Sequence, residues 1–289
     1  MNHIRQKPLY VCVTCDTELL PPWNEGSWEN MSTWSFEKGV PVLRSILDEN
    51  GIKGTFFTQA TAAKCFPEMV RFMADDGHLI GSHGYNHEIL GGKPQKVWTP
   101  SPPVFLKTVE VKRELLIKAD EILELVTGYK PKAFVAPFDN VNYELLELLD
   151  DLEFKVDCSF HNYSLKLNSF PFYPLEGRGL IEIPLTVLPS ESNGYKNVLE
   201  AFTYDYNYSI KKLDEYIRES EQKNPFTVIL LTCHPYEFLE VEIPHPRDVF
   251  IVGYEKKRTL DRLVRMLREY GAEFTTPLHL SERFRSGNV

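Results

Sequence analysis

The chain has 289 residues, of which 43% are hydrophobic and 25% charged, and its formal net charge at pH 7 is -9. This composition is ordinary for a globular protein, and the negative charge argues against nucleic acid or an anionic membrane surface as the main partner. No apolar run approaches the roughly 18 residues of a membrane span, and Met1 to Pro8 lacks the apolar stretch of a signal peptide, so we expect a cytoplasmic protein.

Short runs rich in β-branched residues alternate with amphipathic segments along the chain, which predicts βα units and a mainly parallel sheet. The predicted strands are Tyr10–Thr14, Gly54–Thr58, His78–Ser82, Lys132–Ala136, Phe154–Val156, Leu180–Leu185, Phe226–Thr232 and Glu273–Thr276. The predicted helices are Phe36–Asn50, one between Pro67 and Gly77, Phe105–Thr127, one from the cap Asn142 to Asp150, Ser209–Glu221 and Thr259–Tyr270. No linker or repeat interrupts this alternation, so we expect a single domain over residues 1–289.

Two long segments, 19–34 and 89–103, lack a helical or strand period and are predicted to be loops. The first contains Trp23, Trp28 and Trp34. Aromatic rings on a loop beside a polar site can stack on sugar faces, and they can equally pack on the barrel as a hydrophobic lid. The sequence leaves both interpretations open.

Polar residues of the kinds used in catalysis and metal binding follow the ends of several predicted strands. They are Asp16, Glu18, His83, His87, Asp139, Asp157 and His234. The carboxyl ends of the strands of an α/β barrel meet at one face, where active sites lie, so we expect these side chains to gather there. Side chains alternate along a strand, which predicts that the adjacent Cys15, Cys158 and Cys233 point to the helical layer.

His83 and His87 stand four residues apart, just after a predicted strand. On a helical turn this spacing lets both imidazoles reach one point, and neutral imidazole is a common metal ligand. By itself, however, the pair fits two unrelated surface or capped histidines better than a metal site. A metal site needs a third ligand, and Asp16 and Glu18 offer carboxylates that face the same way in an extended chain.

Taken together, these motifs resemble those of the NodB-homology polysaccharide deacetylases, carbohydrate esterase family 4. The segments that carry the resemblance are Thr14–Glu18 (family T-F-D-D), His83–His87 (H-S-x-x-H), Val135–Phe138 (R-x-P-F/Y, kept in part), Asp157–Ser159 and Leu231–His234 (L-x-H). The similarity extends over nearly the whole chain. It implies an α/β fold, namely an irregular (β/α) barrel with about seven strands.

The resemblance also implies an activity: removal of an N-acyl group, expected to be acetyl, from an amino sugar or glycan. Glu18, His83 and His87 would bind a divalent metal, with Zn²⁺ expected, and a metal-bound water would attack the amide. Asp16 would be the base and His234 the acid that protonates the leaving amine.

Further roles follow from the same resemblance. Asp157 would orient His234, as an acid partner does in other hydrolases. Phe138, Tyr85 and Trp28 would contact the substrate, with a backbone N–H near Phe138 helping to hold the oxyanion.

The chain departs from the family pattern at two positions that bear on chemistry. Val135 stands where the family usually has an arginine that pairs with the catalytic aspartate, and Glu18 stands where it usually has a shorter aspartate. Two alternatives therefore remain open: a metal-independent hydrolase of cyclic amides, resembling allantoinases, and a non-catalytic glycan-binding barrel. The two histidines together with Glu18 favour the metal-dependent enzyme.

Overall fold

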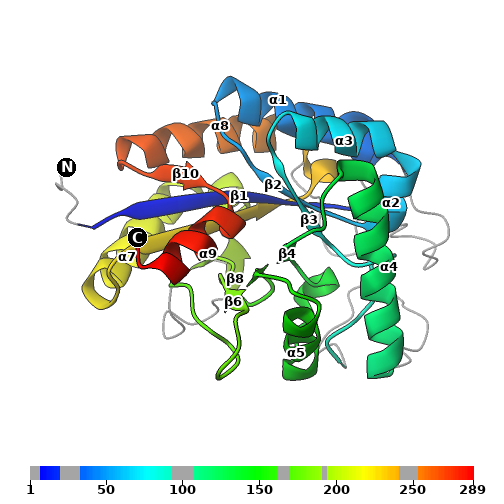
Figure 1. Cartoon of the computed structure of the whole chain (residues 1–289). Helices are drawn as coiled ribbons and strands as arrows, with labels where there is room; N and C mark the ends of the chain where they lie inside the picture. Colours follow the sequence, from blue (N-terminus) through cyan, green and yellow to red (C-terminus); the bar gives the residue numbers. More distant parts are fainter. Residues whose placement is uncertain (1–6, 20–32, 93–106, 162–169, 191–193, 241–252) are drawn as a thin grey trace.

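The computed structural model describes residues 7–19, 33–92, 107–161, 170–190, 194–240 and 253–289. Its centre is a curved sheet of eight parallel strands around which the helices pack (Figure 1). The strands are β1 (Leu9–Thr17), β2 (Thr55–Thr58), β3 (Leu79–Ser82), β4 (Ala133–Phe134), β5 (Val156–Asp157), β6 (Ile181–Glu182), β9 (Thr227–Cys233) and β10 (Glu273–Thr275). This arrangement confirms the predicted parallel α/β barrel, with eight strands where the resemblance implied about seven, and β10 is the strand predicted at Glu273–Thr276.

Strand β1 is the axis of the sheet, because it has parallel neighbours on both sides. It pairs with β9 along most of its length, and on its other edge with β10 near its start and β2 near its end. From β2 the sheet continues through β3, β4 and β5 to β6. Both ends of the chain therefore contribute to one sheet.

The sheet curls until its far end meets β9. The backbone N–H of Thr186, just after β6, donates to the carbonyl of Leu230 (3.2 Å), and the N–H of Leu230 donates to the Thr186 hydroxyl (3.0 Å). A two-stranded antiparallel ribbon, β7 (Val187–Pro189) and β8 (Tyr195–Asn197), follows this junction. The junction brings the carboxyl ends of β1, β9 and β6 to one rim of the barrel.

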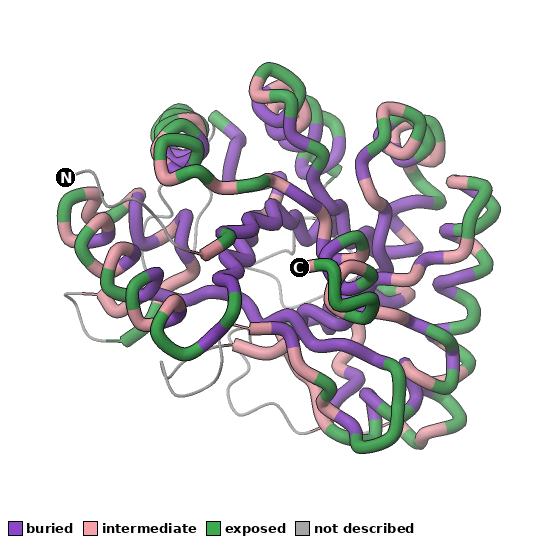
Figure 2. Tube along the Cα trace, turned by 60° about the vertical axis from the view of Figure 1, so that its left-hand side comes forward, coloured by how far each residue is buried: buried purple, intermediate pink, exposed green. Residues whose placement is uncertain are grey.

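The helices surround the sheet, and Figure 2 shows buried strands inside and exposed outer sides on the helices. The helices are α1 (Val40–Glu49), α2 (Ala60–Cys65), α3 (Pro67–Asp75), α4 (Val109–Thr127), α5 (Tyr143–Asp151), α6 (Val198–Tyr204), α7 (Tyr206–Lys223), α8 (Tyr254–Glu269) and α9 (Pro277–Ser286). A π-helical turn, Ser35–Gly39, precedes α1, and 3-10 turns follow β4 (Pro137–Asp139) and β9 (Pro235–Phe238). None of the described helices is long and apolar enough to cross a bilayer.

Alternation along the strands divides the core into an outer and an inner cluster. Odd-numbered residues of β1, such as Val11 and Cys15, pack in the outer cluster against the helices. Even-numbered residues, such as Tyr10 and Cys12, pack in the inner cluster with side chains of the other strands. Side chains that continue the inner rows past the strand ends therefore lie on the face where an active site is expected.

The sequence missed some helices and placed some helix boundaries wrongly. Helices α2, α6 and α9 were not predicted, and α7 and α8 begin before their predicted starts at Ser209 and Thr259. Asp205 accepts a hydrogen bond from the N–H of Tyr208 and so caps α7 earlier than expected.

Candidate active site

Asp16 and Glu18 lie at the end of β1, where the inner row of side chains reaches the rim. The carbonyl of Thr17, between them, accepts from the N–H of Gln59, and the side-chain carbonyl of Gln59 accepts from the N–H of Leu19 (3.1 Å). These bonds hold the end of β1 against the start of α2. Both carboxylates are buried, so they are unlike the acids of a solvated loop.

Glu18, His83 and His87 converge as the sequence predicted. One ligand atom from each lies within 4.8 Å of the others, and the structure describes no other group of three or more His, Cys, Asp or Glu side chains that does so. Oε2 of Glu18 lies 3.5 Å from Nε2 of His83 and in direct contact with Nε2 of His87. All three side chains are buried.

The orientation of His83 suits a cation at this point. Its Nδ1 lies 3.0 Å from the carbonyl oxygen of Val135, which can only accept, so Nδ1 carries a proton. In the neutral imidazole, Nε2 then presents a lone pair towards the carboxylate of Glu18. Two electron-rich atoms that face each other in a buried pocket require a positive charge between them, and the donor set fits a divalent metal.

The pKa shifts at these residues have the same cause. Burial alone would lower the pKa of His83, but the neighbouring carboxylates of Glu18 and Asp16 raise it. Burial alone would raise the pKa of Glu18, but His87 and His83 hold it well below its usual range. The buried pocket therefore favours an ionised Glu18 next to a positive charge.

The two histidines reach this point through a turn and not through the helical turn that the spacing suggested. Gly84 and His87 both have positive φ angles, of 73° and 59°. The carbonyls of Gly84 and Tyr85 accept hydrogen bonds from the first two N–H groups of α2. Glycine suits position 84, where the family usually has serine, because a left-handed conformation costs it little.

Asp16 lies beside the three candidate ligands without being one of them. Its Oδ2 is 3.9 Å from Nε2 of His234, and its buried Oδ1 accepts no hydrogen bond from the described residues. Burial raises the pKa of Asp16, whereas His83 and His234 act against this increase. A buried carboxylate with an oxygen to spare can accept a proton.

His234 is held by Glu237 and not, as predicted, by Asp157. Its backbone N–H and its Nδ1 both lie within 3.0 Å of Oε1 of Glu237, three residues on. Burial alone would lower the pKa of His234, but Glu237, with a smaller contribution from Asp16, raises it to about 10. The sequence signal is the glutamate three residues after the histidine, in His-Pro-Tyr-Glu.

Asp157 lies on the wrong side of its strand for the predicted role. Its neighbours Val156 and Cys158 point into the inner cluster, so Asp157 points to the opposite face. There it accepts from the hydroxyl of Ser159 (2.6 Å), which in turn accepts from the N–H of Ala136 (2.8 Å). Cys15 and Cys233 do point to the helical layer, as predicted, and Cys158 does the reverse.

The Pro137–Asp139 turn brings Phe138 next to the candidate metal ligands. The ring of Phe138 is about one-third exposed, and its centroid lies 4.5 Å from that of His87. Phe138 and Asp139 both have positive φ angles (60° and 51°), a conformation that non-glycine residues seldom adopt and that clusters at functional sites. Asp139 forms an ion pair with His161, and the side chain of Val135 packs in the inner cluster.

The other two predicted substrate contacts have a different outcome. The ring of Tyr85 packs against the outer cluster, with the ammonium group of Lys118 4.0 Å from its centroid. These contacts give Tyr85 a packing role in the helical layer. Trp28 lies outside the described residues.

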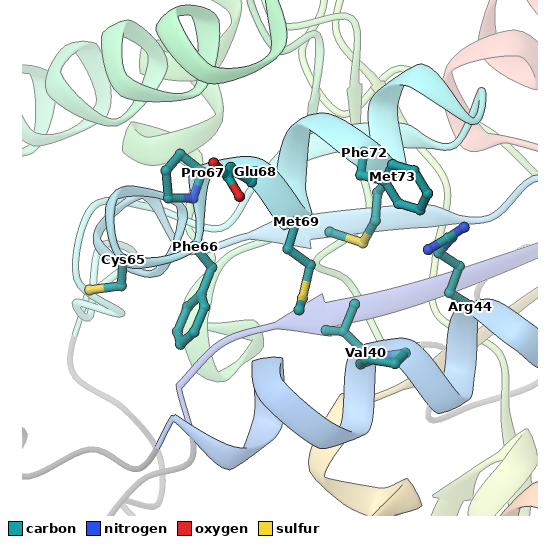
Figure 3. A pocket seen from close by; sticks show the side chains of 10 residues that line it. Val40, Arg44, Cys65, Phe66, Pro67, Glu68, Met69, Phe72 and Met73 are labelled. Carbon is teal, nitrogen blue, oxygen red and sulfur yellow. The ribbon is translucent and has the colours of Figure 1, made fainter.

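A separate cavity of about 610 Å³ lies between α1 and α3 (Figure 3). Side chains of Val40 and Arg44 from α1 face Met69, Phe72 and Met73 from α3 across it. None of its lining residues belongs to the candidate site, so it plays no part in the chemistry considered below.

Comparison with known proteins gives a consistent family. Residues 28–156 match the family model described as polysaccharide deacetylase. The chain is 27% identical over 175 residues to a peptidoglycan deacetylase of Helicobacter pylori, covering 58% of this chain and 53% of that protein. It is 28% identical over 117 residues to a peptidoglycan-N-acetylglucosamine deacetylase of Bacillus cereus, covering 40% of this chain and 38% of that protein. The chain thus spans about half or less of the length of these relatives.

Solved structures show the same fold over nearly the whole chain. A Mycobacterium smegmatis structure, described as that of a candidate polysaccharide deacetylase, superposes with a TM-score of 0.69 at 20% identity and covers 100% of this chain and 94% of the other. A structure of Puue allantoinase gives a TM-score of 0.67 at 14% identity and covers 97% and 91%. The family model over residues 28–156 and the sequence relatives both point to the polysaccharide deacetylases, the family that this chain resembles.

Proposed function

We propose that this protein is a metal-dependent hydrolase that removes an N-acyl group, acetyl in the first place, from an amino sugar of a glycan. The observation that carries the proposal is the convergence of Glu18, His83 and His87 on one point, with Asp16 and His234 beside it. That set supplies ligands, a base and an acid within one buried pocket. Peptidoglycan is the substrate of the named relatives, which makes a glycan containing N-acetylglucosamine the first class to test.

The proposed ligands are the two Nε2 atoms and the carboxylate of Glu18. Two histidines and one carboxylate are a common ligand set of catalytic zinc, and they leave positions open. A divalent cation held there would supply Lewis acidity, which lowers the pKa of a bound water and polarises a carbonyl oxygen. Val135 contributes through its carbonyl, which fixes the tautomer of His83.

Asp16 and His234 would divide the proton transfers between them. Asp16 takes a proton from the attacking water, because its carboxylate is buried and one oxygen accepts no hydrogen bond from the described residues. His234, charged at neutral pH, gives the proton on Nε2 to the nitrogen of the leaving amine as the C–N bond breaks. Oδ2 of Asp16 lies 3.9 Å from Nε2 of His234, so Asp16 can pass the proton that it took from water to His234. This transfer restores the charged imidazole for the next turnover.

Acetate release and metal content, measured on the same protein, test this proposal. We expect freshly purified protein to contain about one divalent ion per chain and to release acetate from N-acetylglucosamine oligomers or peptidoglycan. Substituting His83→Ala should remove the ion and lower kcat/KM at least 100-fold. Removing only a residue that is hydrogen-bonded to a metal ligand already lowers metal affinity or activity about 10–100-fold, and His83 is itself a proposed ligand. The exposed His279→Ala should change neither quantity.

Two results would favour the alternatives. Full activity on a cyclic amide after exhaustive demetallation would indicate a metal-independent, allantoinase-like hydrolase. Glycan binding that persists in Asp16→Asn, with no turnover of any acylated sugar by the parent protein, would indicate a non-catalytic barrel.

A further inference from the structure

Behind His234, on the side away from Asp16, lies a second pair of buried charges that the mechanism above does not use. Glu237 folds back beneath the imidazole through the Pro235–Phe238 turn, and its Oε1 accepts from both nitrogens of His234 that face it. Its other oxygen, Oε2, lies 2.7 Å from the ammonium group of Lys256. Lys256 is only 3% exposed and comes from the first turn of α8, about twenty residues along the chain.

The backbone holds this pair in place as well. The N–H of Gly253, immediately before α8, donates to the carbonyl of Glu237 (2.7 Å). A Cβ at Gly253 would lie 2.9 Å from the carbonyl of Leu239, so the two segments meet more closely than a side chain would allow. The start of α8 is therefore fixed against the turn that carries Glu237.

Charges alternate along the row Lys256, Glu237, His234 and Asp16. Burying a lysine or a glutamate is costly unless each has a partner of opposite charge and satisfied hydrogen bonds. Burial alone would raise the pKa of Glu237, but Lys256 and His234 lower it to about 2. Glu237 is thus kept from taking the proton of the imidazole, and its negative charge stays beside Nδ1.

We infer that Glu237 and Lys256 are positioning residues that fix the His234 imidazole with Nε2 towards Asp16 and keep it protonated for transfer to the leaving amine. This inference rests on the proposed function. In the step concerned, the C–N electron pair goes to the amine nitrogen, which receives the Nε2 proton. Neutral His234 keeps the proton on Nδ1, which is hydrogen-bonded to Glu237. Asp16 then passes the proton that it took from water to Nε2 and so replaces the proton given to the amine.

The test uses Glu237→Gln and the double variant Glu237→Gln/Lys256→Met in the full chain. The double variant removes both charges, so no buried lysine is left unpaired and the fold should survive. Lys257→Met, at an exposed lysine one residue further along the same helix, is the matched control. Metal content and thermal unfolding are measured for each protein first.

Substrates with different leaving groups separate positioning from packing. An amide needs its leaving amine protonated, whereas an aryl acetate ester expels a phenolate that needs no proton. We expect both Glu237 variants to lose on the order of 100-fold in kcat on the amide, the usual scale for general acid catalysis, and less than about 3-fold on the ester. The alkaline limb of the amide pH profile should move to lower pH.

The charge of His234 can also be followed without turnover. In NMR titrations, with His234→Gln used to assign the signal, the imidazole of the parent should stay protonated well above pH 8. In both Glu237 variants it should titrate near the ordinary pKa of about 6.5. Lys257→Met should match the parent in every measurement.

An unchanged titration of His234, or an equal loss on amide and ester in the folded double variant, would overturn the inference. If the parent hydrolyses neither substrate, the proposed function fails, and the NMR titration alone decides whether Glu237 and Lys256 hold the proton on His234.

Discussion

At the scale of single residues, His83 and His234 each have one ring nitrogen held by the protein and the other facing the candidate site. The Val135 carbonyl fixes Nδ1 of His83, and Glu237 fixes Nδ1 of His234, so both Nε2 atoms face inward. Orienting partners of this kind set which nitrogen carries the proton and limit rotation of the ring. The two imidazoles thereby acquire different tasks, because one faces Glu18 and the other faces Asp16.

The separation of Asp16 from Glu18 gives a prediction at this scale. Glu18→Gln should lose the metal, because it removes a charged ligand. Asp16→Asn should keep the metal and lower kcat by about 10²–10⁴-fold, the range for loss of a general base. Metal analysis and acetate release on the two purified variants check this. Loss of metal in Asp16→Asn, to the same extent as in Glu18→Gln, would show that Asp16 is itself a ligand.

How much of the site the sequence could predict depends on how each residue is attached to the fold. Asp16, Glu18, His83 and His234 extend inward-facing rows of strands, and strand-end position alone was enough to group them. Asp157 was placed on the wrong face, because a shift of one residue in a two-residue strand reverses every side chain. Glu237 acts through a turn with no period, so its place three residues after His234 did not by itself predict the contact.

At the scale of elements, the pair β5 and β6 carries two buried carboxyl groups with no cation among their described partners. Oδ2 of Asp157 and Oε2 of Glu182 are buried and have no hydrogen-bond partner among the described residues. Burial raises the pKa of Asp157 to about 6, and burial together with the neighbouring Asp157 raises the pKa of Glu182 well above its ordinary value. A carboxyl whose pKa is raised by folding stabilises the fold while protonated. That contribution is complete below the unfolded pKa of about 3.9 and is lost as the pH rises through about 6.

Asp157→Asn should therefore flatten the pH dependence of stability. The amide can donate to Glu182 at any pH and still accept from Ser159, so the melting temperature at pH 8 should rise by a few degrees, at about 2–4 °C per kcal/mol. At pH 4 the variant and the parent should melt alike, and acetate release should remain within a few-fold of the parent. A loss of activity with unchanged melting would instead restore the catalytic role first predicted for Asp157.

The turn that carries His234 depends on a second element, the π-helical turn before α1. A Cβ added at Gly39 would lie 2.1 Å from the carbonyl oxygen of Pro235, far closer than a Cβ atom can approach a non-bonded oxygen. Gly39→Ala should move His234 away from Asp16, lowering kcat on the amide by at least about 10-fold and destabilising the fold by about 1–3 kcal/mol. Gly179→Ala, where the nearest atom would be 3.8 Å away, is the control. Parental kcat in a folded Gly39→Ala protein would show that the turn is tolerant.

The elements that the sequence missed have weak or short patterns. Helix α2 has six residues and α6 seven, each too short to show a period. Helix α9 has the expected start, with Thr276 as cap and Pro277 in the first turn, but its polar composition concealed it. The strands were easier to predict, because burial on both faces makes them continuous apolar runs.

At the scale of the whole molecule, the barrel closes at Thr186, just after β6. Among the described hydrogen bonds, both its backbone N–H and its side-chain hydroxyl bond to Leu230 of β9. Its buried hydroxyl accepts from the N–H of Leu230 and lies 3.4 Å from the Tyr216 hydroxyl.

Thr186→Val keeps the shape and leaves the Leu230 N–H buried without that acceptor, which should cost about 1–3 kcal/mol. Thr203→Val, whose hydroxyl donates to the carbonyl of Leu199 within α6, should cost less than about 0.5 kcal/mol. Because β9 carries His234 and β1 carries Asp16, the amide activity of Thr186→Val should fall at temperatures where its metal content is still complete. Equal stability of the two threonine variants would mean that the barrel is held shut by its apolar core alone.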